Sequence, residues 1–98
     1  MQWIKKILET NPKNRNKHVI RGIALIDSKY YYLDYIVFTE FNWWCAYEIE
    51  NIDNYDINEI KKQKCDLFFD SLTNKFVSLQ QLPEGILNNY VNYNNIES

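Results

Sequence analysis

The side chains that could carry catalysis or bind a metal are few in this chain. His18 is the only histidine, and Cys45 and Cys65 are the only cysteines. A catalytic triad or dyad needs a nucleophile, a base and an orienting group, and a zinc site needs closely spaced ligand pairs. No such pattern is present, so we expect no catalytic residue, no metal site, no cofactor and no enzyme activity. The two cysteines are expected to be buried, reduced thiols.

The middle of the chain carries the strongest signal for binding. Residues 30–60 contain seven acidic residues and no lysine or arginine, and many aromatic residues lie between the acids. At protein interfaces aromatic rings supply contact area, whereas charges supply orientation and speed of encounter. We therefore predict a partner-binding surface made of acidic and aromatic side chains: Glu40, Trp44, Glu48, Glu50, Asp53 and Asp56.

Basic residues concentrate near the start of the chain. Residues 1–29 hold seven lysines and arginines against two acids. Clustered lysines and arginines can bind the phosphates of nucleic acid. We call residues 13–21 the basic arm, and its alternative nucleic-acid-binding site consists of Lys13, Arg15, Lys17 and Arg21. The isoelectric point of about 5.3 is well below that of a dedicated nucleic-acid-binding domain, so this alternative is less favoured.

A second alternative is a small-ligand-binding domain. Tyr30 and Tyr32 lie in an aromatic stretch, and Trp44 follows in the next expected strand. Aromatic side chains with a few polar groups commonly line ligand pockets. These three residues could therefore line a pocket on one face of a sheet.

Periodicity predicts the elements that position these residues. Trp3, Ile4, Ile7 and Leu8 follow helical spacing, which indicates a short helix over residues 2–10. A polar loop is expected at 13–17. Three segments rich in β-branched and aromatic residues indicate a meander of strands: 18–27, 30–41 and 43–50, with turns at 27–29 and 40–42.

The second half of the chain predicts a helix, a hairpin and a further helix. Asp56 can cap a helix of about two turns, with Glu59 as its capping-box partner. Residues 65–70 and 75–79 flank a turn at 71–74 and indicate a hairpin. Pro83 fits the first position of a closing helix.

Together these elements predict an α+β fold of order α-β-β-β-α-β-β-α with one antiparallel sheet of about five strands. We expect one compact domain over residues 1–98, with 92–98 as a frayed tail. In the strand at 43–50, alternation predicts that Trp44, Glu48 and Glu50 project outward. The expected core consists of the apolar members of each periodic face: Ile4, Ile7, Ile23, Leu25, Leu33, Val37, Cys45, Tyr47, Ile60, Leu67, Phe69, Val77 and Leu87.

These observations favour a small, non-enzymatic, cytoplasmic inhibitor that binds a protein. It would resemble an immunity protein, antitoxin or anti-defence protein in its action, and would dock its acidic surface into a basic site. The expected partner is a basic protein such as a cognate toxin or a nuclease, with neither a membrane nor nucleic acid as the main partner. Asn, Ile, Lys and Tyr make up 42 of the 98 residues, which indicates an AT-rich bacterial or phage gene.

Overall fold

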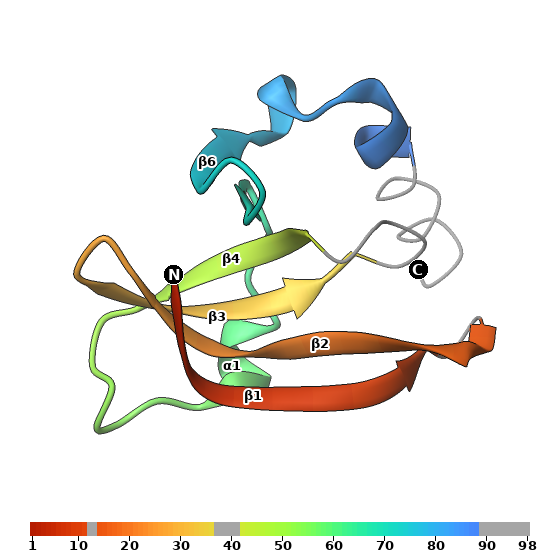
Figure 1. Cartoon of the computed structure of the whole chain (residues 1–98). Helices are drawn as coiled ribbons and strands as arrows, with labels where there is room; N and C mark the ends of the chain where they lie inside the picture. Colours follow the sequence, from red (N-terminus) through yellow and green to blue (C-terminus); the bar gives the residue numbers. More distant parts are fainter. Residues whose placement is uncertain (12–13, 37–41, 89–98) are drawn as a thin grey trace.

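The computed structural model describes residues 1–11, 14–36 and 42–88, and the side chains of these residues apart from 11–19. The described strands form a six-stranded antiparallel sheet in which each strand pairs with the next one in sequence (Figure 1). Its strands are β1 (Gln2–Asn11), β2 (Asn14–Ile26), β3 (Lys29–Tyr35), β4 (Trp43–Ile49), β5 (Leu67–Asp70) and β6 (Lys75–Ser78). Within these described ranges, helical structure is limited to α1 (Ile57–Ile60), the 3₁₀ turn η1 (Leu79–Gln81) and residues 84–88.

The predicted α+β fold with three helices and about five strands is wrong, because the expected N-terminal helix is a strand. β1 pairs with β2 from Gln2↔Leu25 to Asn11↔Asn14. Ile4 is 49% exposed and Leu8 is 62% exposed, so the apolar residues of this segment do not share one buried face. The loop predicted at 13–17 is wrong over residues 14–17 as well, since β2 begins at Asn14; residue 13 lies outside the described residues. Pairing with a partner strand supplies the backbone hydrogen bonds that an isolated short helix cannot secure.

The turns and the second hairpin agree with the sequence pattern. Asp27 and Ser28 have φ values of 50° and 67°, which are the left-handed values of a tight two-residue hairpin turn. β5 and β6 form the expected hairpin, with Asn74 at φ 56° in its turn. The turn predicted at 40–42 is described only at Asn42, and the expected tail at 92–98 lies outside the described residues.

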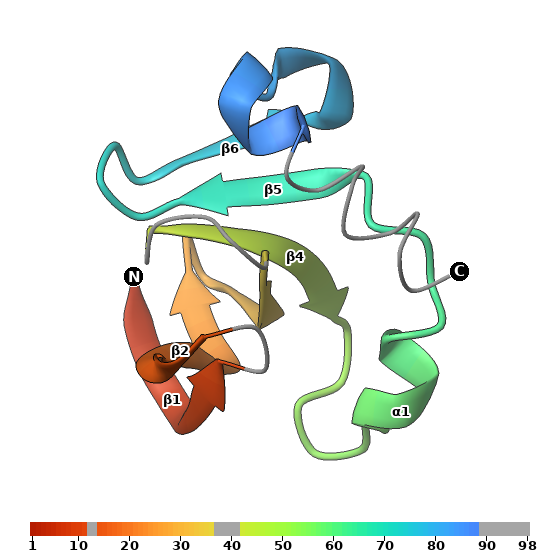
Figure 2. The same cartoon turned by 90° about the vertical axis from the view of Figure 1, so that its right-hand side faces the viewer.

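The sheet is bent, so that strands distant in its order meet over one face (Figure 2). The rings of Trp3 in β1 and Trp44 in β4 lie edge to face with centroids 5.8 Å apart. The rings of Tyr31 in β3 and Phe76 in β6 are also in contact, with their centroids 4.9 Å apart. Side chains from the strands themselves therefore fill this concave face. Its buried cluster consists of Ala24, Ile26, Tyr31, Leu33, Trp44, Ala46 and Phe69.

The opposite face of the sheet is covered by helical segments. Ile60 of α1 packs with Ile23, Tyr32 and Ile49. Further along this face, Leu82 and the residues around it pack on a cluster that contains Cys45, Cys65 and Phe68. Both faces of the sheet are thus covered. The alternation of apolar and polar residues along a strand therefore does not show which side chains are buried and which are exposed.

The burial of Trp44 is the clearest correction on β4. The prediction that this side chain projects outward is wrong, because Trp44 is only 4% exposed. Its indole Nε1 donates a hydrogen bond to the Ile20 carbonyl oxygen at 2.8 Å. The bend of the sheet turns the face that alternation assigned to solvent into the main core.

The predicted core is confirmed in part. Ile23, Leu33, Cys45, Ile60 and Phe69 are buried. Six more are half-buried: Ile7, Leu25, Tyr47, Leu67, Val77 and Leu87. Ile4 is exposed, and Val37 lies outside the described residues.

The two cysteines are buried and free, as predicted. A hydrogen bond with Cys65 and burial both raise the pKa of the Cys45 thiol, which therefore stays protonated at neutral pH.

Candidate functional site

An acidic groove lies where β4 ends and the chain passes into α1. It is an open depression of about 550 Å³. Four carboxylates line it, and no lysine or arginine is among its lining residues. The lining side chains come from the end of β4, the following loop and α1: Glu48, Ile49, Glu50, Asn51, Asn54, Tyr55, Asp56, Glu59, Ile60 and Gln63.

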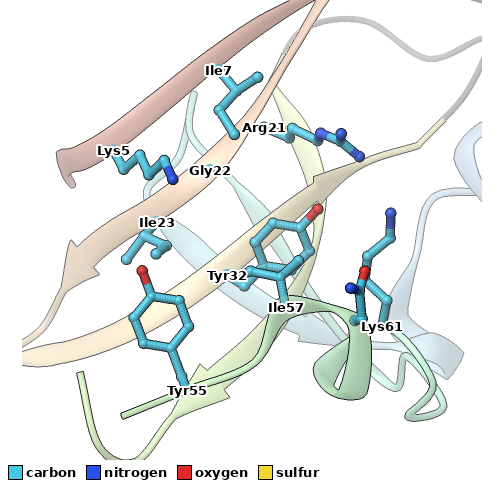
Figure 3. A pocket seen from close by; sticks show the side chains of 10 residues that line it. Lys5, Ile7, Arg21, Gly22, Ile23, Tyr32, Tyr55, Ile57 and Lys61 are labelled. Atoms are coloured by element: carbon cyan, nitrogen blue, oxygen red, sulfur yellow. The ribbon is translucent and has the colours of Figure 1, made fainter. Parts of the chain in front are cut away.

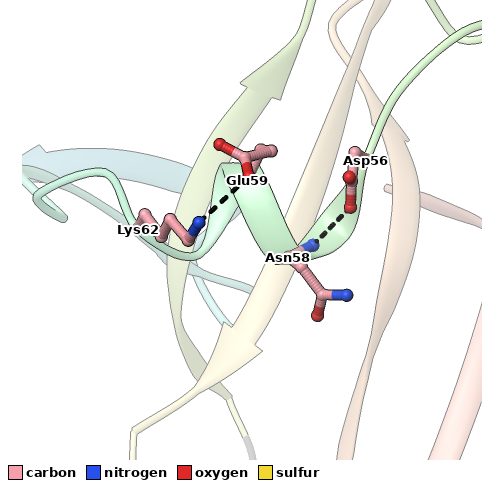
Figure 4. Close-up of polar contacts among 4 residues, drawn as sticks. All are labelled: Asp56, Asn58, Glu59 and Lys62. Carbon is pink, nitrogen blue, oxygen red and sulfur yellow. Dashed lines mark hydrogen bonds and ion pairs between the residues drawn. The ribbon is translucent and has the colours of Figure 1, made fainter.

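The helix α1 sets the position of the acids on one side of the groove. The Asp56 carboxylate Oδ1 accepts a hydrogen bond from the Asn58 backbone N–H at 2.9 Å, which caps the first turn as predicted (Figure 4). Ile57 and Ile60 anchor the helix on the sheet. Glu59 therefore faces away from the core, and its Oε1 accepts from Lys62 Nζ at 3.0 Å rather than completing a capping box.

The loop between β4 and α1 is held by its own backbone contacts. Asn51 Oδ1 accepts from the Asp53 backbone N–H at 3.0 Å, and the Asn51 carbonyl oxygen accepts from the Asn54 N–H at 3.2 Å. Asparagine favours such local turns because its short side chain reaches the backbone two residues on. These two hydrogen bonds fix the conformation of the loop that forms the floor of the groove.

Two lysines pair with acids at the rim of the groove. Lys29 Nζ lies 3.2 Å from Glu48 Oε1, and this hydrogen bond raises the pKa of Lys29. Lys62 pairs with Glu59. All four of these side chains are exposed, and exposed ion pairs contribute little, so both acids stay available to a stronger cationic partner. In the described part of the chain no ion pair reaches Glu50 or Asp56.

The groove unites half of the predicted partner-binding residues. Glu48, Glu50 and Asp56 all line it. Asp53 is exposed on the adjoining loop but is not a lining residue. Trp44 lies in the core instead, and Glu40 falls outside the described residues.

Tyr55 is an aromatic residue of the groove that is not among the six predicted partner-binding residues. Its side chain is exposed, and it belongs to the groove wall. An aromatic side chain within the polar stretch 51–56 was the available signal.

The predicted basic arm does not appear as a free cationic loop. Arg21 lies within β2, and its guanidinium forms an ion pair with Glu9 of β1. The backbone at Arg15 and Lys17 is part of β2, but their side chains belong to the part left undescribed. Lys13 is likewise outside the described residues.

The pocket expected from Tyr30, Tyr32 and Trp44 is not formed by these three residues. Tyr32 belongs to the cluster beneath α1, and Tyr30 packs beside it. Trp44 belongs to the cluster on the concave face. Successive residues along a strand point to opposite faces of the sheet, and the tryptophan lies on the face opposite to that of the two tyrosines.

Among the residues that the structure describes, no group of three His, Cys, Asp or Glu side chains is arranged to hold a metal ion. No helix in the described ranges is long and apolar enough to cross a membrane. Comparison with protein-family models, curated proteins and solved structures found no significant match.

Proposed function

We propose that this chain is a non-enzymatic inhibitor, of the immunity, antitoxin or anti-defence kind, that docks its acidic groove onto a basic site of another protein. One observation carries the proposal. Four carboxylates gather around a single groove whose lining residues include no lysine or arginine. Such a surface attracts basic clefts and repels nucleic acid and anionic lipid headgroups.

The construction of the groove supports docking of a structured partner. Its helix is capped and anchored, and its loop is held by hydrogen bonds. Side chains that are already positioned lose less entropy on binding. Tyr55 adds aromatic contact area beside the acids, and tyrosine is enriched among the residues that carry most of the binding energy at protein interfaces.

A nuclease or another protein that handles nucleic acid is the partner class that fits this chemistry. The phosphate-binding cleft of such a protein carries clustered lysines and arginines. Carboxylates presented by a small rigid protein can occupy that cleft in place of phosphates. The proposal includes a cytoplasmic site of action, where thiols such as those of Cys45 and Cys65 stay reduced.

Charge reversal in the groove tests this proposal. The wild-type chain, immobilised, is used to capture a partner from extracts of its source cells after nuclease treatment. The captured protein is then purified, and its Kd is measured by calorimetry. Glu50→Lys should weaken binding by about tenfold or more, since it removes an attraction and adds a repulsion. Glu84→Lys is the matched control, because Glu84 is exposed and outside the groove.

Two outcomes would overturn the proposal. Equal losses of affinity for Glu50→Lys and Glu84→Lys would show that only net charge matters. A partner that keeps its full activity when saturated with the wild-type chain would show that binding does not inhibit.

A further inference from the structure

We propose that a second, cationic cavity, between β1, β2 and β3 on one side and α1 on the other, binds a small organic anion. The anion would carry one carboxylate on an apolar body about the size of a single ring. This inference concerns a site separate from the acidic groove and does not depend on the proposed function.

The cavity has a volume of about 160 Å³ (Figure 3). An engineered apolar cavity of about 150 Å³ is known to hold one benzene molecule, so a ligand with one six-membered ring fits, whereas a nucleotide does not. The walls combine three isoleucines and two tyrosines, Tyr32 and Tyr55, with three cations: Lys5, Arg21 and Lys61.

A bulge in β1 brings a lysine to this cavity. Trp3 pairs with Ala24, but the next pair is Lys5↔Ile23, so the register shifts by one residue at Ile4. Without the shift, Ile4 would lie opposite Ile23, on the face of the cavity. The bulge places the cation of Lys5 at the cavity instead of that apolar side chain. Bulges beside binding sites commonly redirect a side chain in this way.

A buried hydroxyl in the same cavity has no acceptor for its proton among the described residues, although the Arg21 guanidinium, which can only donate, interacts with its oxygen. Tyr32 is 2% exposed, and no described residue forms a hydrogen bond of good geometry with its hydroxyl. Figure 3 shows that hydroxyl on the side of the cavity where Arg21 lies. Buried polar groups are nearly always hydrogen-bonded, so an orphaned one calls for an explanation. A carboxylate oxygen bound in the cavity would accept this hydrogen bond.

The charges around the cavity favour an anion. No carboxylate is among its lining residues, although Arg21 pairs with Glu9 and the charge of Asp34 acts on both Arg21 and Lys61. The cations of Lys5, Arg21 and Lys61 outnumber these two acids. Binding one carboxylate would complete the charge balance and form charge-assisted hydrogen bonds.

Benzoate is the probe that tests this site, with benzamide as its neutral counterpart. We expect benzoate to bind the full chain with a Kd of about 1 mM or tighter, as measured by NMR titration. Benzamide should bind at least about fivefold more weakly, because it lacks the charge. Inorganic phosphate tests whether an anion alone suffices, and it should bind more weakly than benzoate because it leaves the isoleucine wall uncovered.

Matched lysine substitutions locate the site. Lys5→Gln and Lys61→Gln should each weaken benzoate binding by about threefold or more. Lys6→Gln and Lys64→Gln are the controls, since both lysines are exposed and do not line the cavity; they should leave the Kd unchanged. Tyr32→Phe should weaken benzoate more than benzamide, which separates loss of the hydroxyl from damage to packing. Tyr55 lines both the cavity and the acidic groove, so it is left unchanged.

The proposal is overturned if benzamide binds as well as benzoate, if the control lysines matter as much as Lys5 and Lys61, or if benzoate shows no saturable binding. Glu50→Lys, which tests the acidic groove, should leave benzoate binding unaffected. Failure of either proposal is therefore distinguishable from failure of the other.

Discussion

At the scale of single residues, Trp44 shows how one side chain can join two parts of a sheet. It contacts Trp3 at 5.8 Å between ring centroids and donates to the Ile20 carbonyl oxygen at 2.8 Å. Both contacts reach strands that do not pair with β4. The indole therefore holds the bend of the sheet as well as filling its concave face.

Trp44→Ala should lower the free energy of unfolding by about 3–5 kcal/mol, because it leaves a large cavity and an unpaired carbonyl. Urea denaturation measures this loss. Leu72→Ala is the control, since Leu72 is 79% exposed, and it should change stability by no more than about 0.5 kcal/mol. Equal midpoints for the two variants would contradict the central role of Trp44.

At the scale of elements, the pairing of β1 with β2 depends on a glycine. Gly22 has φ 149°, and a Cβ at this position would lie 1.9 Å from the Lys5 carbonyl oxygen. The bulge in β1 therefore approaches β2 more closely than any side chain at this position would permit. Gly85, in the helical residues 84–88, faces open space, and a Cβ there would meet nothing within 4 Å.

Gly22→Ala should destabilise the protein by about 2–4 kcal/mol, because the strand must move or the bulge must be lost. Gly85→Ala should be neutral or stabilise by up to about 1 kcal/mol, because alanine favours the helix and restricts the unfolded chain. Thermal unfolding of both variants provides the comparison. A Gly22→Ala protein as stable as Gly85→Ala would mean that the bulge is not required.

At the scale of the whole molecule, charge is divided between two neighbouring regions. The acidic groove lies on one side of α1 and the cationic cavity on the other, and Tyr55 contributes to both. A net charge of −2 conceals this division. The proposed partner surface and the proposed anion site would thus occupy separate, oppositely charged parts of one small domain.

The stability of the whole molecule should also depend on pH through Asp70. Burial alone would raise the pKa of this carboxyl, but hydrogen bonds outweigh burial and lower it. Asn42 Nδ2 donates at 2.8 Å, the Thr73 hydroxyl at 2.9 Å and the Leu72 N–H at 3.0 Å. A depressed pKa stabilises the fold above the unfolded value of about 3.9. That stability is lost as the pH falls through the folded value.

Asp70→Asn should therefore be less stable than wild type at pH 7 and should lose less stability between about pH 5 and pH 2. Urea denaturation across this range gives the comparison. Asp66→Asn, at an exposed neighbouring carboxylate, should keep the pH dependence of the wild type. The explanation fails if Asp70→Asn and wild type lose stability in parallel.

Local patterns were sufficient for several parts of the molecule. The turn at Asp27 and Ser28, the cap at Asp56 and the β5–β6 hairpin were all predictable, because neighbouring residues determine each of them. The gathering of acids also followed from order along the chain, since Glu48, Glu50 and Asp56 lie within nine residues. Short-range geometry is enough to bring such residues together.

Other features were decided by contacts between distant segments. The sequence by itself determined the strands at 18–26, 30–35 and 43–49, the hairpin at 67–78 and the place where the acids cluster. Only the tertiary structure decided that residues 2–10 form a strand, since that state depends on pairing with β2 and on the space left by Gly22. It also decided that Trp44 is buried, since the bend of the sheet encloses the concave face on which Trp44 lies. Helical and strand patterns overlap in short apolar segments, so long-range packing settles which state prevails.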